Sequence, residues 1–335
     1  MHREAERKGQ LLTVSDGTLS ESDARAMLER IRWPNGPHCV FADCGGAEVY
    51  RIEVKGKTLK SGRVVGPRHL LKCKACRRQF SVTKGTIFED SKIPLRMWIL
   101  VMYRMCSSKK GVSAHQIHRE FGLSYESAWF MCHRVRYAMA DKNPTKLSGV
   151  IEADETYVGG KPRGHAEHRR KRREGNPEPI SRFANKAAVF GIKERGGRVR
   201  ARVMDSPSRE QVEREVFHNV DRENAQLMTD EHIIYRKIKD LLPHQIIRHK
   251  SEYVRGEVHT QSIESFWAVL KRGLIGTYHH VDAGYLGQYV NEFQFRHNSR
   301  KIKDGERFTS LLGNVEGRLD WYVGRSAKPS SSGAG

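Results

Sequence analysis

The stretch VIEADETYVGG, residues 150–160, decides the fold of the second half of the chain. Apolar and polar residues alternate up to Asp154, a pattern typical of a β-strand with one buried face. We therefore predict a strand over residues 148–156. By strand parity Glu152 and Asp154 share a face, so the alternation alone does not decide which of the two carries chemistry.

The residues that follow alternate between strand-like and helix-like segments. Glycines at 196–197 join two predicted strands into a hairpin. The pattern predicts a mixed α/β domain with strands at 187–193, 199–204, 225–228 and 245–248, and helices at 208–219, 231–240, 260–272 and 283–298.

Three acidic residues stand where this arrangement can bring them together. Asp154 ends the first strand, Asp230 follows the apolar strand of AQLMTDEHIIY (225–235), and Glu264 lies in the helix of HTQSIESFWAVLKRG (259–273). Carboxylates at the ends of neighbouring strands, together with one from a packing helix, can converge at one sheet edge. The alternative is that all three solvate the surface; Glu152, Glu155 and Glu231 lie close by and compete for the same assignment.

Such a cluster would require metal. Two carboxylates 4 Å apart repel by roughly 4 kcal/mol at an effective dielectric constant of 20. Two hard cations, Mg²⁺ or Mn²⁺, would relieve this repulsion and stabilise the attacking and leaving oxygens of a phosphodiester.

The charge of the chain also indicates a polyanionic partner. The 335 residues include 60 Lys and Arg against 39 Asp and Glu, which gives a formal net charge of +21. Nucleic acid is the partner that such an excess favours, although a merely soluble basic protein is the alternative. The segment KPRGHAEHRRKRR, 161–173, is predicted to be a mobile loop that follows phosphates through Arg169, Arg170, Lys171 and Arg172.

Four of the six cysteines have the spacing of zinc ligands. Cys73 and Cys76 form a C-x2-C knuckle, and Cys39 and Cys44 are the expected partner pair, which predicts a zinc ribbon with four cysteine ligands. The gap of four residues between Cys39 and Cys44 leaves open whether His38 replaces one sulfur. The alternative is a set of buried free thiols, which the cationic neighbours of the second pair disfavour.

Between this ribbon and the α/β domain the pattern is helical. A helix is predicted to begin at Ser20, another covers 94–106, and 113–139 reads as two helices around Phe121-Gly122-Leu123. A short helix, a glycine turn and a basic second helix favour a helix-turn-helix, with Arg134 and Arg136 on its outer face as DNA contacts. An ordinary helical hairpin is the alternative.

Nothing in the sequence indicates a membrane protein. The longest apolar run, 97–103, is too short to span a bilayer, and the N-terminus has no apolar signal region. We expect a cytoplasmic protein.

The chain resembles the ISXO-like DDE transposases of bacterial insertion sequences, which carry an N-terminal zinc ribbon. The resemblance covers residues 25–310. It is carried by RWPNGPHC (32–39), CKACRRQFSVTKGTIFEDSKIPLRMW (73–98), ADETYVGGKPRG (153–164), TDE (229–231), IESFWAVLKRGLIGTYHHV (263–281) and YVNEFQFRHN (289–298).

The resemblance implies an RNase H-like catalytic domain with a mixed five-stranded sheet. It implies that Asp154, Asp230 and Glu264 hold the metal ions, and that Lys271, helped by Arg272, contacts DNA. It further implies Mg²⁺-dependent hydrolysis of double-stranded DNA at the element's inverted repeats and attack of the freed 3′-OH on target DNA. At least a dimer, associated with the bacterial nucleoid, is then expected.

The predicted chain is thus a multidomain α+β protein. Its parts are an N-terminal helix region (1–30), the zinc ribbon (31–90), the helix-turn-helix (91–146), the catalytic domain (147–312) and a tail with a disordered end (313–335). Two rival functions remain, a structure-selective nuclease of the same fold and a non-enzymatic zinc-ribbon regulator. For His259, orienting water or DNA and simple packing are equal alternatives, whereas core packing is the expected role of Trp267.

Overall fold

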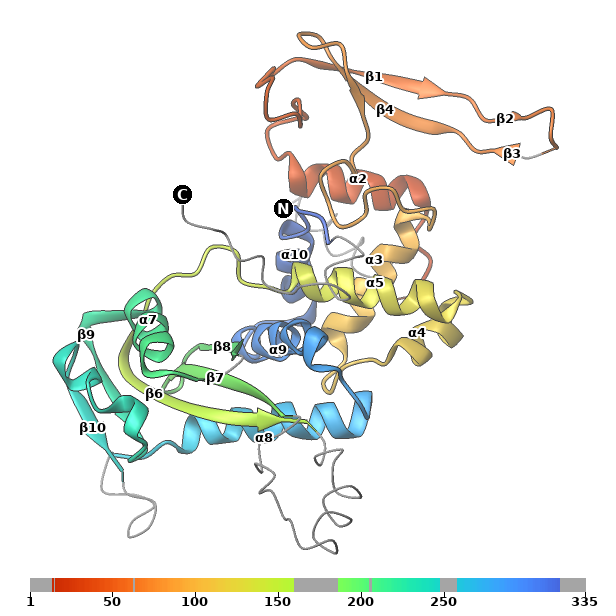
Figure 1. Ribbon diagram of the computed structural model, residues 1–335. Helices are drawn as coiled ribbons and strands as arrows, with labels where there is room; N and C mark the ends of the chain where they lie inside the picture. Colours follow the sequence, from red (N-terminus) through yellow and green to blue (C-terminus); the bar gives the residue numbers. More distant parts are fainter. Residues whose placement is uncertain are drawn as a thin grey trace, which may run out of the picture. The chain divides into compact units, whose positions relative to one another are not determined.

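The computed structural model describes residues 14, 16–62, 64–159, 186–204, 207–247 and 258–319. The chain divides into two compact units (Figure 1), Met1–Ala138 with Ile302–Trp321, and Met139–Lys301 with Tyr322–Gly335. Among the described residues, no helix is both long enough and apolar enough to cross a membrane.

The first unit begins with helix α2, Glu21–Arg32, and a small antiparallel sheet. The Ser20 side chain caps α2 by accepting a hydrogen bond from the Asp23 N–H, as the sequence predicted. The sheet contains β1 (Val49–Val54), β4 (Arg68–Cys73) and β5 (Gln79–Phe80), in the order β1-β4-β5. Two short strands, β2 (Lys57–Thr58) and β3 (Val64–Val65), pair with each other as a separate hairpin.

The described part of this unit contains four further helices, α3 (Leu95–Ser107), α4 (Ala114–Phe121), α5 (Tyr125–Ala138) and α10 (Asp304–Gly313). Gly122, with a φ of +62°, makes the left-handed turn between α4 and α5, so the predicted pair of helices is present. The boundaries proposed from sequence placed α10 in the catalytic domain. It belongs instead to the first unit, because its buried Phe308, Leu311 and Leu312 pack with α2 and α3.

The second unit contains a five-stranded sheet in the order β10-β9-β6-β7-β8. Its central strand β6, Leu147–Val158, pairs antiparallel with β7 and parallel with β9. Strands β7 and β8 are antiparallel, and β9 and β10 are parallel. The predicted mixed α/β character is therefore present, with strands β7 (Ala187–Glu194), β8 (Val199–Met204), β9 (Val220–Thr229) and β10 (His244–Ile246).

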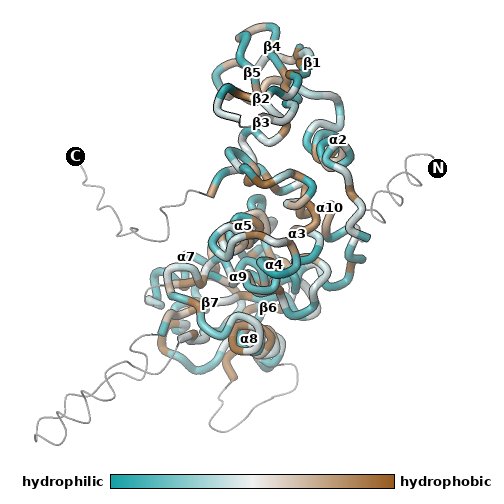
Figure 2. The backbone as a smooth tube through the Cα atoms, turned by 90° about the vertical axis from the view of Figure 1, so that its right-hand side faces the viewer, coloured by the Kyte–Doolittle hydropathy of each residue, from teal (hydrophilic) through white to brown (hydrophobic). Residues whose placement is uncertain are grey.

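Helices cover both faces of this sheet, and each face has its own apolar core. One core packs α7, Arg209–Asn219, and the segment 234–242 against one face of the strands. The other packs α8 (Gln261–Gly273) and α9 (Ala283–Asn298) against the opposite face, through Ile263, Phe266, Trp267, Leu270 and Phe293 among others. Figure 2 shows the mixture of apolar and polar residues along α8 that this packing requires.

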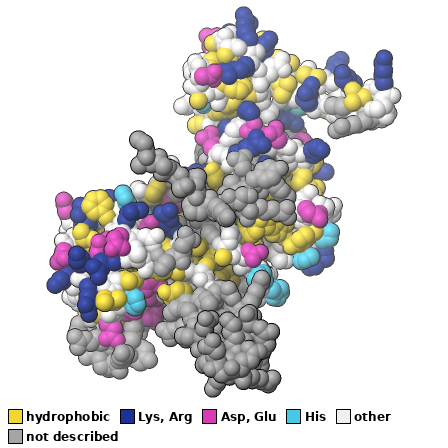
Figure 3. Space-filling model, viewed as in Figure 1, with side chains coloured by type: hydrophobic (Ala, Val, Ile, Leu, Met, Phe, Trp, Pro, Cys, Tyr) yellow, Lys and Arg dark blue, Asp and Glu magenta, His cyan; other side chains and the backbone are white. Residues whose placement is uncertain are grey.

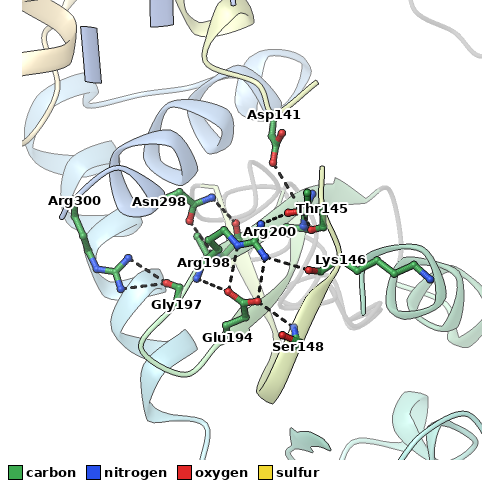
Figure 4. A network of polar contacts seen from close by, with 11 residues as sticks. Asp141, Thr145, Lys146, Ser148, Glu194, Gly197, Arg198, Arg200, Asn298 and Arg300 are labelled. Carbon is green, nitrogen blue, oxygen red and sulfur yellow. Dashed lines mark hydrogen bonds and ion pairs between the residues drawn. The ribbon is translucent and has the colours of Figure 1, made fainter. Parts of the chain in front are cut away.

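Side chains of α9 bind the outer strand β8. Asn298 accepts a hydrogen bond from the Val199 N–H and donates one to the Val199 carbonyl. Gln294 accepts a hydrogen bond from the Ala201 N–H. These contacts satisfy main-chain groups that an edge strand would otherwise leave open. In the adjoining network (Figure 4), Glu194 accepts from the Ser148 N–H, which joins the start of β6 to the β7–β8 turn.

The prediction of one helix over residues 231–240 is wrong. Two short 3-10 helices, Ile233–Tyr235 and Ile238–Asp240, occupy this segment. Branched Ile residues are only moderate helix formers, and Tyr235 and Ile238 are both fully buried in the core beneath the sheet. Tertiary packing of these two side chains therefore overrides the periodicity on which the prediction depended.

Candidate functional site

Asp154 lies on β6, directly opposite Gly191 of β7 in the strand register. The indole Nε1 of Trp267 donates a hydrogen bond to Asp154 Oδ2 at 3.0 Å. A Cβ atom at Gly191 would come within 2.5 Å of the Trp267 ring, so only glycine leaves room for the indole there. Strand β7 and helix α8 thus fix the carboxylate of Asp154 together.

The other two predicted acids lie close enough to Asp154 to affect its ionisation. Burial, followed by the charge of Asp230 and, to a smaller degree, that of Glu264, raises the pKa of Asp154 to about 6. Asp230 directly follows β9, and its Oδ1 accepts from the His232 N–H at 3.0 Å. Glu264 lies in the first turn of α8, where its Oε1 accepts from Thr260 Oγ1 at 2.8 Å.

The three carboxylates are more loosely grouped than the cysteines described below. In the part of the chain that the structure describes, the four cysteines alone form a set of three or more ligands with all atoms within 4.8 Å of one another. The charges of Asp230 and Glu264 affect the pKa of Asp154, but the oxygens of the three carboxylates do not form a set this close. Mutual repulsion of this kind is relieved when a divalent cation binds carboxylate oxygens.

Glu152 and Asp154, which share a face of β6, have different surroundings. Glu152 is fully buried. Its Oε1 accepts from Arg195 Nε at 3.0 Å, and its Oε2 accepts from the main-chain N–H of Ile263 at 2.9 Å. Both oxygens are therefore engaged within the protein, which leaves Asp154 as the acid of this pair that is available to a ligand.

The buried Glu152 and Lys193 and the partly buried Arg195 form a group, here called the β6–α8 clamp. Lys193 lies opposite Glu152 in the strand register, and its Nζ donates to the carbonyl of Ser262 at 2.8 Å. Arg195 Nη2 donates to the carbonyl of His259 at 3.2 Å. The clamp therefore holds the residues just before Glu264 against the strand that carries Asp154.

His259 lies against this clamp. Its Nδ1 is 3.4 Å from Glu152 Oε1 and 3.4 Å from Arg195 Nη2. Of the two roles considered from sequence, these contacts favour packing.

A further carboxylate, Glu155, interacts with the opposite core. Its Oε1 accepts a hydrogen bond of 2.5 Å from the hydroxyl of the fully buried Tyr235. Burial is the largest cause that raises the pKa of Glu155 to about 7, and the charges of Asp154 and Asp230 add to it. The acidic neighbourhood thus includes a fourth carboxylate that the sequence pattern named only as a competitor.

Lys271 and Arg272 lie in the last turn of α8 and are both exposed. Glu264, also exposed, lies seven residues before Lys271, which places both on one side of the helix two turns apart. This side of α8 therefore presents an acid near its start and cations near its end.

The four predicted zinc ligands are close together in the first unit. The Sγ atoms of Cys39 and Cys76 are 3.8 Å apart, and those of Cys44 and Cys73 are 3.7 Å apart. Burial raises the pKa of Cys39 to about 12, whereas the hydrogen bond from Arg78 lowers the pKa of Cys76 to about 6. Four thiol ligands at this spacing suit a tetrahedral structural zinc ion.

His38 is not a member of this cluster. All four sulfurs belong to it, and the His38 ring lies edge-on to Trp33, 6.1 Å away between centroids. The longer gap is accommodated by a turn in which the Cys44 N–H donates to the Phe41 carbonyl. Gly46 is packed against the cluster, since a Cβ there would lie 2.9 Å from Cys73 Sγ.

The prediction that Arg134 and Arg136 form an exposed basic face is wrong. Their exposed fractions are 6% and 1%. Arg134 Nη1 donates to the carbonyls of Ile87 and Glu89, and its guanidinium lies 4.7 Å from the Phe130 ring centroid. Arg134 thus binds the chain's own backbone. The four predicted phosphate contacts Arg169, Arg170, Lys171 and Arg172 lie outside the described residues.

Several functional positions were not identified from the sequence. The spacing of Trp267 indicated only a core residue, and nothing marked Gly191 or the β6–α8 clamp. The one available signal was the unusual occurrence of Lys193 at the end of an apolar strand, AAVFGIKE, where a buried cation needs a buried partner.

Residues 146–298 match the family described as the ISXO2-like transposase domain, and residues 19–79 match the transposase zinc-ribbon domain. An uncharacterized protein in transposable element ISH50 of Halobacterium salinarum is 29% identical over 299 residues, which are 88% of this chain and 96% of that protein. A chain in the crystal structure of the Mos1 strand transfer complex has 10% identity and a TM-score of 0.23, covering 68% of this chain and 81% of that one, a likeness too low to carry an argument.

Proposed function

Because the chain carries an ISXO2-like transposase domain behind a transposase zinc ribbon, we propose that it cleaves DNA at the ends of an insertion sequence and joins them to target DNA. The single observation that carries this proposal is the placement of three acids, with Asp154 on β6, Asp230 directly after the paired strand β9, and Glu264 on α8, the helix whose Trp267 donates a hydrogen bond to Asp154. Three acids from β6, the end of β9 and α8 would thereby hold divalent cations, Mg²⁺ or Mn²⁺.

The sheet order supports an RNase H-like fold for the catalytic domain. Three antiparallel strands, β8-β7-β6, continue into two parallel strands, β9 and β10. Asp154 on the central strand and Asp230 after its parallel neighbour are then brought to one region of the sheet, since β6 and β9 run in the same direction.

The residues present fit the proposed ions. Carboxylate oxygens are the ligands that Mg²⁺ prefers. Burial and, after it, repulsion from Asp230 and Glu264 raise the pKa of Asp154, and a bound cation would favour the ionised carboxylate against both. When bound, two such ions would stabilise charge on the attacking and leaving oxygens of the phosphodiester.

The chain's own residues have separate tasks in this proposal. Trp267 orients Asp154 through its hydrogen bond, and the β6–α8 clamp holds the start of α8. Lys271 and Arg272, exposed at the other end of α8, would bind the phosphate backbone next to the cleaved bond. Two element ends must be held at once, so at least two copies would assemble on DNA.

The proposal is tested with a duplex that carries the inverted repeat found in the DNA flanking the gene, a plasmid target and Mg²⁺ or Mn²⁺. We expect cleavage at the repeat and transfer of the new 3′ end into the plasmid. Asp154→Asn should abolish cleavage and retain DNA binding, whereas Glu223→Gln, at an exposed acid, should leave both unchanged.

Two results would redirect the proposal. Cleavage without joining, by the unaltered chain, would favour a nuclease of the same fold. DNA binding without cleavage would favour the non-enzymatic regulator, and unchanged cleavage by Asp154→Asn would reject the assigned site.

A further inference from the structure

The first unit carries a β-hairpin that extends away from the zinc cluster, here called the hairpin arm, residues 55–68. Its strands β2 and β3 pair antiparallel, with Thr58 opposite Val64. The Gly62 N–H donates to the Leu59 carbonyl in the turn, and Gly62 has a φ of +76°. Figure 1 shows this arm continuing outward from β1 and β4.

All side chains that the structure describes in the hairpin arm, those of residues 55–62, 64 and 66–68, are exposed. Both residues of β2 are exposed, and so are the apolar Leu59 (36%) and Val64 (74%) near the tip. A two-stranded ribbon that buries neither face gains little stability from its own packing. Apolar side chains kept in water on such a ribbon suggest a surface that another molecule covers.

The arm lies within a stretch of the sequence that has no acidic residue. Residues 54–88 contain ten Lys or Arg and no Asp or Glu. The arm's described cations, Lys55, Lys57, Lys60 and Arg68, are all exposed. Lys and Arg side chains stand out along the projecting hairpin in Figure 3.

These cations differ from those nearer the base of the sheet. Arg51 pairs with Glu29, and Lys74 is 2.7 Å from Glu48. Within the described part of the chain, the four cations of the arm have no ion pair and no side-chain hydrogen bond. Their charge is thus available to a partner, and the partner must be anionic.

We propose that the hairpin arm lies in a groove of duplex DNA, with Lys57 and Lys60 against the phosphates and the apolar tip, Leu59 and Val64, toward the bases. A two-stranded β-ribbon fits the major groove, which is about 12 Å wide. This inference rests on the proposed function in one respect, since it takes the duplex to be the DNA that the transposase acts on. It adds a contact that is separate from both the zinc cluster and the carboxylates.

The test compares two double variants that each remove two exposed lysines from the first unit. Lys57→Ala/Lys60→Ala alters the arm, and Lys109→Ala/Lys110→Ala alters the segment between α3 and α4. Affinity for the inverted-repeat duplex is measured from 50 to 300 mM salt, on the scale of the salt titrations used for such proteins. We expect the arm variant to bind about 3- to 30-fold more weakly at about 100 mM salt, with a log–log salt slope smaller by about 1 to 2, and the control to match the unaltered chain.

Two further readouts separate this inference from the proposed function. Zinc content should remain one ion per chain in the arm variant, and its cleavage at saturating DNA should equal that of the unaltered chain. The inference is overturned if affinity and slope are unchanged in the arm variant, if both variants lose affinity equally, or if the unaltered chain does not bind the duplex. If the salt slope depends on the arm but the unaltered chain does not cleave DNA, the inference about the arm is retained and the proposed enzymatic function is rejected.

Discussion

The main-chain N–H of Ile263 donates a hydrogen bond of 2.9 Å to Glu152 Oε2, which ties the first turn of α8 to β6. Glu152 lies two residues before Asp154, and Ile263 directly precedes Glu264. A carboxylate at a helix N-terminus satisfies an otherwise open N–H and interacts favourably with the helix dipole. One buried acid thus sets the relative position of the two elements that carry two of the proposed metal ligands.

Glu152→Gln should weaken the metal site without removing a ligand. The substitution removes the buried negative charge that pairs with Arg195, whose own side chain is 21% exposed, and this should cost about 1–3 kcal/mol of stability. Because α8 would be less firmly held, we expect the Mg²⁺ concentration for half-maximal cleavage to rise severalfold. Thermal unfolding and a metal titration of cleavage measure the two effects.

Val216→Ala is the matched control for this prediction. Val216 is fully buried in the core on the other side of the sheet, so its truncation should lower stability without touching α8. If both variants change the metal requirement equally, Glu152 contributes stability alone and does not position the site.

Gly191→Ala should displace the indole from Asp154. The added Cβ would come within 2.5 Å of the Trp267 ring, which we expect to cost about 1–3 kcal/mol and to reduce cleavage at least tenfold. Gly287→Ala is the control, because Gly287 lies inside α9 with nothing within 4 Å of the added atom. That change should stabilise the helix by about 0.5–1 kcal/mol and leave cleavage intact. Full activity of Gly191→Ala would show that the Trp267 hydrogen bond is dispensable.

Asp154→Asn should stabilise the metal-free protein at neutral pH. The folded pKa of about 6 exceeds the ordinary value of 3.8, so between these values the folded state binds more protons than the unfolded state. Stability therefore falls as pH rises through this window, and the ionised carboxylate costs about 1–3 kcal/mol at pH 7. We expect a higher free energy of unfolding for the variant at pH 7 and none of this difference below pH 4. A difference of the opposite sign would contradict the arrangement of the acids.

The zinc ribbon should require all four sulfurs and no histidine. Cys73→Ser/Cys76→Ser should lose the zinc ion and much of the stability of the first unit, since metal binding contributes folding energy. His38→Ala and Cys132→Ala should each keep one zinc per chain, because His38 packs on Trp33 and Cys132 is a buried helical residue. Metal analysis after dialysis measures this, and loss of zinc from His38→Ala would reject the assignment of four cysteine ligands.

Arg134→Ala should act on stability and not on the salt dependence of DNA binding. The substitution removes the donors to the Ile87 and Glu89 carbonyls, both buried contacts, and we expect a loss of about 2–4 kcal/mol. The log–log salt slope should be unchanged. A variant of normal stability with a reduced slope would restore Arg134 to the DNA interface.

Local signals predicted much of the fold. The helix start at Ser20, the glycine turn at Gly122 and the strand alternation around Asp154 all correspond to the structure. The cysteine spacing identified the zinc ligands, because four thiols on two tight turns have few other uses in one small unit.

What could not be predicted depends on tertiary packing. The periodicity of α5 marks one apolar face, yet residues 131–136 are buried on every side, so Arg134 is not on a solvent face. Strand parity could not separate Glu152 from Asp154, because the difference is made by Arg195 and by the N–H of Ile263, which are distant in sequence. The need for glycine at position 191 could not be predicted either, because it arises only in the folded protein, where the Trp267 ring occupies the space of a Cβ atom.

Iron-mediated cleavage of the polypeptide tests most directly whether Asp154, Asp230 and Glu264 share one cation site. Fe²⁺ added to the zinc-loaded chain with ascorbate and peroxide generates hydroxyl radicals that cut the backbone next to the bound ion, and mass spectrometry locates the cuts. We predict cuts near residues 154, 230 and 264 together, suppressed by excess Mg²⁺ and lost in Asp154→Asn. Cuts near one of these residues without the other two, or cuts that Mg²⁺ does not suppress, would contradict a shared site.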